Sequence, residues 1–487
     1  MQTSEWVNTA ESLDPENWEN LRSLGHRMVD DMMDYLQNVR ERPAWKKPSS
    51  YAIKSMQHPL PEWPSDPDAV YEDFLTQVLP FNTNNIHPRF WSWVEGGGSA
   101  FGMMADMLAS GMNANLAIGN HIPMYVERQV LDWAKEIFGF PSSASGLLTS
   151  GASMANLTAL VVARNVSNKQ IRKHGLQSNS APLTIYGSTE THSCIVKAAE
   201  VIGIGSDQFR RVPVDGKYRI RTDQLKMMIE DDRKNGFRPF ALIGNAGTVN
   251  TGAIDDLTEL ATIARTEKIW FHVDGAFGAV PRILPEYFEQ LKSIDMADSL
   301  SFDFHKWFYM NYEVGCVLIR DAAAHRQAFS SQVNYLLQHE RGLSAGPESF
   351  SNYGIELSRG FKALKVWMLL KENGIRKYSR LVRQNISQAR YLAGLIRVQS
   401  SLELLAEPSL NIVCYRFNNG ISNDDEMNIL NKEILMRLHE EGIATPSYTV
   451  LHGHYAIRVA ITNHRSQLED FDALVKATVR LGLELSR

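Results

Sequence analysis

Between residues 146 and 320, short runs of almost continuous apolar residues alternate with stretches in which apolar residues recur at helical spacing. This alternation is typical of a mainly parallel sheet that is buried on both faces by helices. The predicted strands are Gly146 to Thr149, Leu183 to Tyr186, Phe240 to Ile243, Ile269 to Val273 and Ser299 to Phe302, with a further apolar run from Val314 to Ile319. Helices such as Met154 to Arg164 and Ile195 to Ile202 fit between them. The predicted fold class is therefore α/β.

The N-terminal segment has a different pattern. Residues 14–37 are predicted to form an amphipathic helix, with Asp14 as the N-cap, Pro15 at the first helical position and an apolar stripe from Trp18 to Leu36. Prolines then recur between residues 43 and 67 and break regular structure. Such an arm has little core of its own, so residues 1–85 are predicted to be a helical arm that packs on another surface, such as a second subunit.

Two further domains are predicted from the remaining pattern. Helices are expected from Met103 to Gly111 and from Tyr125 to Phe138, so the large α/β domain is predicted to span residues 86–380. After residue 380 the chain has its own strands and a closing helix from Gln467, which indicates a small α+β domain over residues 381–487. The late strands are Asn411 to Tyr415 and Ala456 to Ile461.

Composition narrows the possible partners and compartment. The net charge is −5, from 50 basic and 55 acidic residues, and no basic patch indicates nucleic acid. No apolar run reaches the roughly 18 residues that a membrane span needs, and the N-terminus lacks the pattern of a signal peptide. The three cysteines are far apart and form no CxxC pair, which argues against disulfides or a zinc site. A cytoplasmic protein without a metal site is expected.

Polar residues follow the predicted strands, at the edge where parallel sheets bind ligands. The first strand leads into small residues that include Ala152 and Ser153 at a helix start, which suits an anion, although Ser153 could be an ordinary cap. The second leads to His192, which could lie flat over a planar ring or simply begin a helix. The third leads into a polar loop that includes Thr248. None of these stretches is a Walker loop or a dinucleotide fingerprint.

The fourth strand ends in Asp274, with Ala276 close behind. A carboxylate at the end of a buried strand is costly unless it meets a cation, and a protonated pyridine nitrogen is such a cation. Lys306 follows the next strand, flanked by His305 and Trp307. Burying its ammonium costs several kcal/mol unless its pKa falls or it reacts with an aldehyde. In isolation, a lysine in a tight turn would be the simpler interpretation.

One ligand, pyridoxal phosphate (PLP), suits all four strand ends. Its phosphate fits the helix start that follows the first strand, and its ring face fits His192. Its ring nitrogen fits Asp274, and its aldehyde fits Lys306, the pairing expected of a Schiff-base lysine and an acidic partner. The sequence therefore predicts a PLP enzyme, with Thr248 and Ala276 among the cofactor contacts.

The chain also resembles the group II PLP decarboxylases, which include aromatic-L-amino-acid, histidine and glutamate decarboxylases. The resemblance covers nearly the whole chain. It is carried by His87 to Phe90, Thr149 to Asn156, Thr191 to Ser193, His272 to Ala276 and Asp303 to Trp307. It implies a fold-type I transferase-like architecture and an obligate homodimer with swapped N-terminal helices. It also implies that Ala152, Ser153, Asp303 and His305 help to hold the phosphate, with Asp303 replacing the asparagine of animal aromatic decarboxylases.

The resemblance implies decarboxylation of an L-amino acid through an external aldimine. After CO₂ leaves, family members protonate Cα with a tyrosine on a mobile loop, and the matching residue here is Tyr335. The expected catalytic residues are thus Lys306, His192, Asp274 and Tyr335.

The substrate is less constrained. Phe90, Trp91 and Trp93 favour an aromatic amino acid, and Trp93, Val94 and Glu95 are the predicted substrate-wall residues. Glu95 could bind a cationic side chain or face solvent. An aldehyde synthase or a carbon–carbon lyase on the same fold is an alternative, and a non-catalytic relative is a third. Retention of Tyr335 speaks against the synthase.

Overall fold

The computed structural model describes residues 12–176, 181–330, 339–420 and 423–486. The chain divides into two compact units. The first comprises residues 1–42 and 46–83, and the second comprises residues 43–45 and 84–487. Each unit is described separately below.

The first unit is helical. It contains α1 (Trp18–Gln37), α2 (Ser50–Ser55) and α3 (Pro67–Asp73). The helix that was predicted to begin at residue 14 begins at Trp18, so the assignment of Asp14 as its N-cap is wrong. Asn17 is the cap because its side-chain oxygen accepts the backbone N–H groups of Glu19 (3.0 Å) and Asn20 (3.2 Å). Pro15 therefore precedes the helix.

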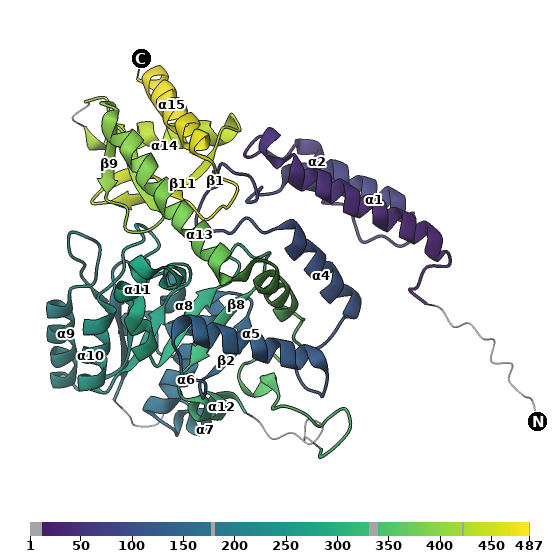
Figure 1. The fold of residues 1–487 in the computed structure, drawn as a ribbon. Helices are drawn as coiled ribbons and strands as arrows, with labels where there is room; N and C mark the ends of the chain where they lie inside the picture. Colours follow the sequence, from purple (N-terminus) through teal and green to yellow (C-terminus); the bar gives the residue numbers. More distant parts are fainter. Residues whose placement is uncertain (1–11, 177–180, 331–338, 421–422, 487) are drawn as a thin grey trace, which may run out of the picture. The chain divides into compact units, whose positions relative to one another are not determined.

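The second unit is built on a seven-stranded sheet with the order β2-β8-β7-β6-β5-β3-β4 (Figure 1). Its strands are β2 (Ser145–Thr149), β3 (Leu183–Ser188), β4 (Phe209–Val212), β5 (Arg238–Asn245), β6 (Trp270–Asp274), β7 (Ser299–Asp303) and β8 (Gly315–Ile319). Strands β4, β3, β5, β6 and β7 run parallel, whereas β8 is antiparallel to both β7 and β2. The predicted α/β class and the mainly parallel sheet are confirmed.

Helices cover both faces of this sheet. The helices of this part of the chain are α4 (Ala100–Met112), α5 (Ile122–Phe138), α6 (Ala152–Ser167), α7 (Ile171–His174), α8 (Ser193–Val201), α9 (Thr222–Lys234), α10 (Leu257–Glu267), α11 (Pro285–Leu291) and α12 (Ala322–Phe329). Of these, α5, α6, α9, α10 and α12 contact strands of the sheet, whereas α4 packs on α13 (Ala363–Val398). Successive residues of β5 face opposite sides, as strand geometry requires. Ala241 and Ile243 share a core with residues of α6 and α8, while Leu242 shares the other core with residues of α10.

A second sheet has the order β1-β11-β12-β10-β9. Its strands are β1 (Phe90–Trp91), β9 (Leu402–Ala406), β10 (Ile412–Phe417), β11 (Thr445–Leu451) and β12 (His454–Ala460), and its helices are α14 (Asp424–Glu440) and α15 (Leu468–Leu485). The long helix α13 (Ala363–Val398) is interrupted at Gly374, whose φ is 62°. The two-residue strand β1 pairs in parallel with β11. Residues from early in the chain thus complete a sheet formed mainly by its C-terminal part.

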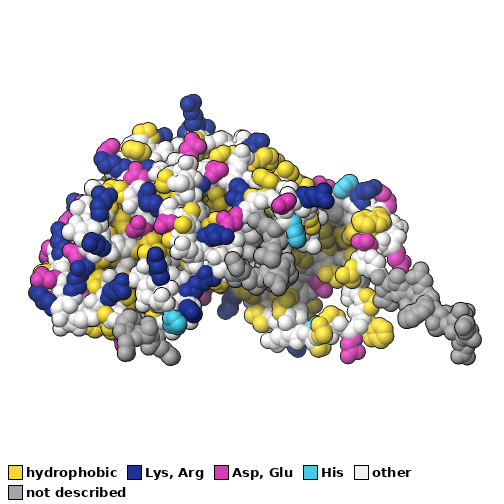
Figure 2. All heavy atoms as spheres, turned by 90° about the horizontal axis from the view of Figure 1, so that it is seen from below, with side chains coloured by type: hydrophobic (Ala, Val, Ile, Leu, Met, Phe, Trp, Pro, Cys, Tyr) yellow, Lys and Arg dark blue, Asp and Glu magenta, His cyan; other side chains and the backbone are white. Residues whose placement is uncertain are grey.

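The surface of the protein is mixed in charge. Figure 2 shows one face, on which basic and acidic side chains are interspersed among apolar and uncharged ones. Among the described residues, no helix combines the length and apolar character that crossing a bilayer requires.

Candidate active site

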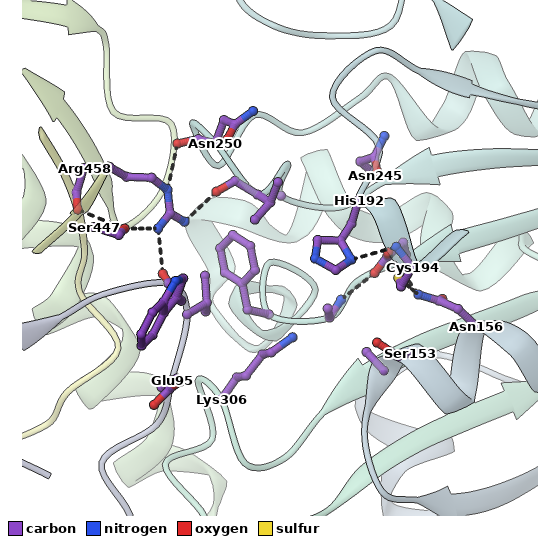
Figure 3. A pocket seen from close by; sticks show the side chains of 18 of the residues that line it. Glu95, Ser153, Asn156, His192, Cys194, Asn245, Asn250, Lys306, Ser447 and Arg458 are labelled. Carbon is purple, nitrogen blue, oxygen red and sulfur yellow. Dashed lines mark hydrogen bonds between the residues drawn. The ribbon is translucent and has the colours of Figure 1, made fainter. Parts of the chain in front are cut away.

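A cavity of about 370 Å³ lies where the carboxyl ends of the large sheet meet residues of the second sheet. This size is within the range of small-molecule sites. The residues that follow β2, β3, β6 and β7 contribute Ser153, His192, Asp274 and Lys306 to its wall. The structure therefore brings these predicted residues together, and the loop that contains Thr248 also reaches the cavity through Gly247, Val249 and Asn250. Figure 3 shows the side chains of Ser153, His192 and Lys306 around the cavity.

Asp274 is fixed at the end of β6 by two donors. Its Oδ2 accepts the side-chain amide of Asn156 at 3.1 Å, and its Oδ1 accepts the backbone N–H of Ala276 at 3.1 Å. Asp274 is only 6% exposed, so few solvent molecules compete for its charge. The strand end thus presents an oriented, largely desolvated carboxylate, which a cationic group in the cavity would stabilise.

A buried histidine orients the amide that holds Asp274. His272 Nε2 donates to Asn156 Oδ1 at 2.7 Å, while Ser299 Oγ lies 2.8 Å from His272 Nδ1. Burial lowers the pKa of His272 to about 4, so the ring is neutral at physiological pH. With its proton on Nε2, the ring accepts at Nδ1 and fixes the Asn156 amide with its N–H groups directed at Asp274.

Lys306 lies just beyond β7 and forms an ion pair with Asp303. Its Nζ is 2.8 Å from Asp303 Oδ2; the Lys306 side chain is 22% exposed and that of Asp303 is 1% exposed. Burial lowers the pKa of Lys306, but the charge and hydrogen bond of Asp303 raise it, and the net direction is upward. The lysine was expected to react or to have a lowered pKa; as long as it is a free amine, its pairing with Asp303 raises its pKa instead.

His192 is the N-cap of α8. Its Nδ1 accepts the backbone N–H of Cys194 at 3.2 Å, which fixes the ring at the cavity wall. Burial lowers the pKa of His192, although the charge of Asp274 acts in the opposite direction. Figure 3 shows the His192 ring and the Lys306 side chain pointing into the same cavity. A neutral imidazole there can contact a planar ligand.

The start of α6 offers donors for an anion. Ala152 and Ser153 occupy its first turn, where N–H groups lack partners within the helix. The backbone is packed closely here, because a Cβ on Gly315 would lie 2.5 Å from the Cα of Gly151. Asp303 Oδ1 is buried without a hydrogen-bond partner among the described residues. A donor from outside the chain would satisfy this oxygen.

Three predicted cofactor residues, Thr248, Asp303 and His305, lie behind the wall rather than in it. Thr248 is 1% exposed, and its hydroxyl bonds to Thr251 Oγ1 at 3.1 Å and to the Ala253 N–H. His305 Nδ1 bonds to the backbone of Val314, and its Nε2 lies 3.6 Å from Asp303 Oδ2. The Thr248 side chain thus holds the loop after β5, and the His305 side chain faces the Asp303 carboxylate.

The predicted substrate wall is partly correct in its geometry. Trp93, Val94 and Glu95 line the cavity. Phe90 and Trp91, which were taken to favour an aromatic substrate, do not line it, because they form β1 and are 4% and 0% exposed in the core. Tyr335 lies outside the described residues.

Sequence reasoning missed the contribution of the second sheet. Arg458 of β12 is 3% exposed, and its guanidinium donates to the backbone oxygens of Trp93 (2.7 Å) and Asn250 (3.2 Å) and to Ser447 Oγ (3.0 Å) (Figure 3). Burial lowers the pKa of Arg458 to about 10, so it remains charged at neutral pH. Nothing in its local sequence marks it, because its position depends on how two distant segments pack.

These residues fit PLP. The cavity combines an anion-binding helix start, a neutral imidazole, an oriented carboxylate and a lysine on adjoining strand ends. The helix start suits the phosphate of that cofactor, and the imidazole suits its ring face. The carboxylate suits its pyridine nitrogen, and the lysine suits its aldehyde. Asp303, whose Oδ1 is buried without a hydrogen-bond partner among the described residues, is the carboxylate that pairs with Lys306.

The comparisons with known proteins agree with this fit. The conserved domain of pyridoxal-dependent decarboxylases matches residues 50–418, so the chain belongs to that family. It is a PLP-dependent carboxy-lyase with the fold-type I architecture that the sequence predicted, and the predicted amino-acid decarboxylation is confirmed at that level.

Individual relatives extend over almost the whole chain. An aromatic-L-amino-acid decarboxylase from Bacillus atrophaeus is 34% identical over 473 residues, which cover 96% of each chain. A phenylacetaldehyde synthase from Arabidopsis thaliana is 28% identical over 460 residues, covering 92% of this chain and 93% of the relative. The crystal structure of Oryza sativa TDC with PLP and tryptamine is similar in fold, with a TM-score of 0.90 and 23% identity over 98% of this chain and all of that one.

Proposed function

We propose that the protein decarboxylates an aromatic L-amino acid to the corresponding amine and CO₂. The main support is the cavity wall, where the aromatic side chains of Trp93, Phe277, Tyr312 and Tyr448 share one cavity with Lys306. Aromatic walls favour a flat apolar side chain through burial and ring stacking. The 34% identity to the Bacillus atrophaeus decarboxylase supports the same substrate class.

We further propose the following cofactor contacts. Lys306 Nζ attaches to the cofactor aldehyde, His192 covers the ring, and Asp274 pairs with the ring nitrogen. Ala152 and Ser153 hold the phosphate from the start of α6, and Asp303 and His305 help to hold it. Ala276 would contact the cofactor from the cavity wall, and Thr248 would support that wall from behind through its bonds to Thr251 and Ala253. The strand-end geometry around Asp274 and Lys306 is the support for this arrangement.

Different residues of the chain have different roles in the proposed decarboxylation. Bound PLP supplies an electron sink for the electron pair of the broken Cα–carboxylate bond. Asp274 keeps the ring nitrogen protonated, because its carboxylate is fixed and largely desolvated. His192 holds the ring in place, and Tyr335 delivers a proton to Cα after CO₂ has left.

A panel of amino acids tests this proposal. Release of CO₂ and of amine should be measured for aromatic, acidic, basic and aliphatic L-amino acids with the PLP-loaded protein. Borohydride reduction followed by peptide mapping should place the cofactor label on Lys306. Labelling of a different lysine, or an absence of CO₂ from every aromatic amino acid, would refute the proposal.

An aldehyde synthase is the second candidate, because phenylacetaldehyde synthases are among the relatives. Such an enzyme consumes O₂ and releases aldehyde, CO₂, ammonia and hydrogen peroxide in place of the amine. The tyrosine at position 335 favours the decarboxylase, since a proton donor at this step competes with oxygen. Amine and peroxide measured per CO₂ released, with and without air, distinguish the two activities.

We also propose that the protein is a cytoplasmic homodimer. The helical first unit leaves large apolar side chains exposed, including Trp18 at 61%, Leu60 at 88% and Trp63 at 82%. Exposed apolar residues in such numbers are typical of interaction surfaces. A stable, active 55 kDa monomer in light scattering would contradict the dimer. The three cysteines are free and buried, which suits a reducing compartment.

A further inference from the structure

Glu95 is held rigidly at one end of the cavity. Its backbone oxygen accepts the hydroxyl of Thr462 at 2.7 Å, and the N–H of the next residue, Gly96, donates to the backbone oxygen of His305 at 3.2 Å. Gly96 lies so close to the lysine turn that a Cβ would be 2.4 Å from the backbone oxygen of Lys306. The backbone on both sides of the Glu95 side chain is therefore fixed beside Lys306.

The Glu95 carboxylate has no hydrogen bond or ion pair with any other residue that the structure describes. Burial raises its pKa, and the charge of Lys306 opposes that rise. Lys306 Nζ pairs with Asp303 at 2.8 Å, and among the described residues it forms no ion pair with Glu95. A half-buried carboxylate with unused acceptors is stabilised by any donor that enters the cavity.

The surroundings of Glu95 limit what that donor can be. In Figure 3, Glu95 and Arg458 lie on one side of Lys306, and His192 and Ser153 lie on the other. The end that holds Glu95 is thus opposite the proposed phosphate-binding end. Its wall is aromatic, with Trp93 59% exposed. The aromatic wall suits a flat ring, and a polar N–H or O–H on the edge of that ring would meet the Glu95 carboxylate.

We propose that Glu95 determines specificity by accepting a hydrogen bond from an N–H or O–H group on the ring of an aromatic substrate. This inference rests on the proposed function and narrows its substrate class. Phenol and indole side chains carry such a donor, and a phenyl side chain does not. A hydrogen bond to a charged acceptor in a cavity discriminates by about tenfold or more against the analogue that lacks the donor.

The test compares kcat/KM for tyrosine, tryptophan and phenylalanine in the parent and two variants. The parent should prefer tyrosine or tryptophan to phenylalanine by about tenfold or more. Glu95→Leu should abolish this preference, and Glu95→Gln should keep part of it, because the amide oxygen still accepts. Glu289→Leu is the matched control, since Glu289 lies on α11, pairs with Lys292 and does not line the cavity.

Inhibition by the product amines gives a readout that does not depend on turnover. Tyramine should inhibit the parent more strongly than phenethylamine, and Glu95→Leu should equalise them. The visible absorbance and the dissociation constant of the cofactor should be measured for each variant. A large loss of cofactor affinity in both variants would overturn the inference, because Glu95 would then act on the cofactor.

The remaining outcomes distinguish a failure of the proposed role of Glu95 from a failure of the proposed decarboxylase activity. Equal use of tyrosine, tryptophan and phenylalanine by the parent, or a preference that survives in Glu95→Leu, overturns the role of Glu95 and leaves aromatic decarboxylation intact. A parent that prefers lysine or ornithine, and loses that preference in Glu95→Leu, shows that Glu95 binds a cation. No CO₂ from any aromatic amino acid refutes the proposed function itself.

Discussion

Replacing Asp303 by asparagine should make the Lys306 amine more reactive in the protein without cofactor. Lys306 Nζ lies 2.8 Å from a carboxylate that is 1% exposed. Burial alone lowers the pKa of Lys306, and Asp303 reverses that direction through its charge and its hydrogen bond. Asparagine keeps the shape but removes the charge, so the pKa of Lys306 should fall. At a fixed pH below that pKa, the neutral, nucleophilic fraction of the amine should therefore rise.

The size of the effect follows from the closeness of the pair. An opposite charge at this distance stabilises the charged form by about 1.4 to 4 kcal/mol. Since each 1.4 kcal/mol is a factor of ten in an equilibrium, Lys306 should be acylated about tenfold faster or more at about pH 8 in Asp303→Asn. The lower part of the range applies because the lysine side chain is 22% exposed.

Trace labelling with acetic anhydride, followed by peptide mass spectrometry, measures this reactivity directly. Lys292 is an internal control in the same sample, because it is on the surface and pairs with Glu289 at 2.6 Å. Its labelling rate should be the same in both proteins. If Lys306 is labelled at the parent rate in Asp303→Asn while Lys292 is unchanged, Asp303 does not hold the ammonium and the reasoning fails.

Other substitutions test the remaining parts of the site. Gly96→Ala places a Cβ 2.3 Å from the backbone oxygen of His305 and 2.4 Å from that of Lys306, so single-turnover CO₂ release should fall about 100-fold. Gly394→Ala, which has open space around it, should release CO₂ at the parent rate. Asn156→Ala removes the side-chain donor to Asp274 and leaves only the Ala276 N–H, so a cofactor titration should show about tenfold weaker binding; unchanged affinity would contradict this. Tyr335→Phe should yield less amine and more peroxide per CO₂ in air, and parent-like amine production would refute its role as proton donor.

Much of the large sheet could be predicted because its strands are buried on both faces. Apolar runs such as Phe240 to Ile243 have no polar face and are recognisable without context. The edge strand β4, with sequence Phe-Arg-Arg-Val, was missed because its middle residues are not buried. The two-residue strand β1 could not be predicted either, since it exists only by pairing with β11, more than 350 residues later. The start of α1 was misplaced because Asp14 and Asn17 are both suitable caps, and the side chain of Asn17 is the one that caps it.

Some cavity residues could likewise be predicted from the local sequence, whereas others depend on the packing of distant segments. Lys306, Asp274 and His192 each follow a strand of the parallel sheet, so topology alone brings them to one edge. Arg458 comes from an antiparallel strand of the second sheet, and its place depends on the packing of residues 93, 250 and 447 around it. The partner of Lys306 was also not foreseen. The resemblance implies a phosphate contact for Asp303, which stays a prediction; the structure adds that its Oδ2 pairs with Lys306 and that its Oδ1 has no partner among the described residues.

Asp274 and Asp303 both end strands near Lys306, which raises the question of which of these two carboxylates pairs with it. Both oxygens of Asp274 already accept hydrogen bonds, from Asn156 and from the Ala276 N–H, which fix the carboxylate at the end of β6. Among the described residues, Asp303 Oδ1 has no hydrogen-bond partner, and Asp303 Oδ2 forms the ion pair with Lys306. Because Lys306 is held by Asp303, Asp274 keeps its charge for a different cation. The neutral His272 strengthens this division, since it fixes the Asn156 amide without adding a charge that would compete for Asp274.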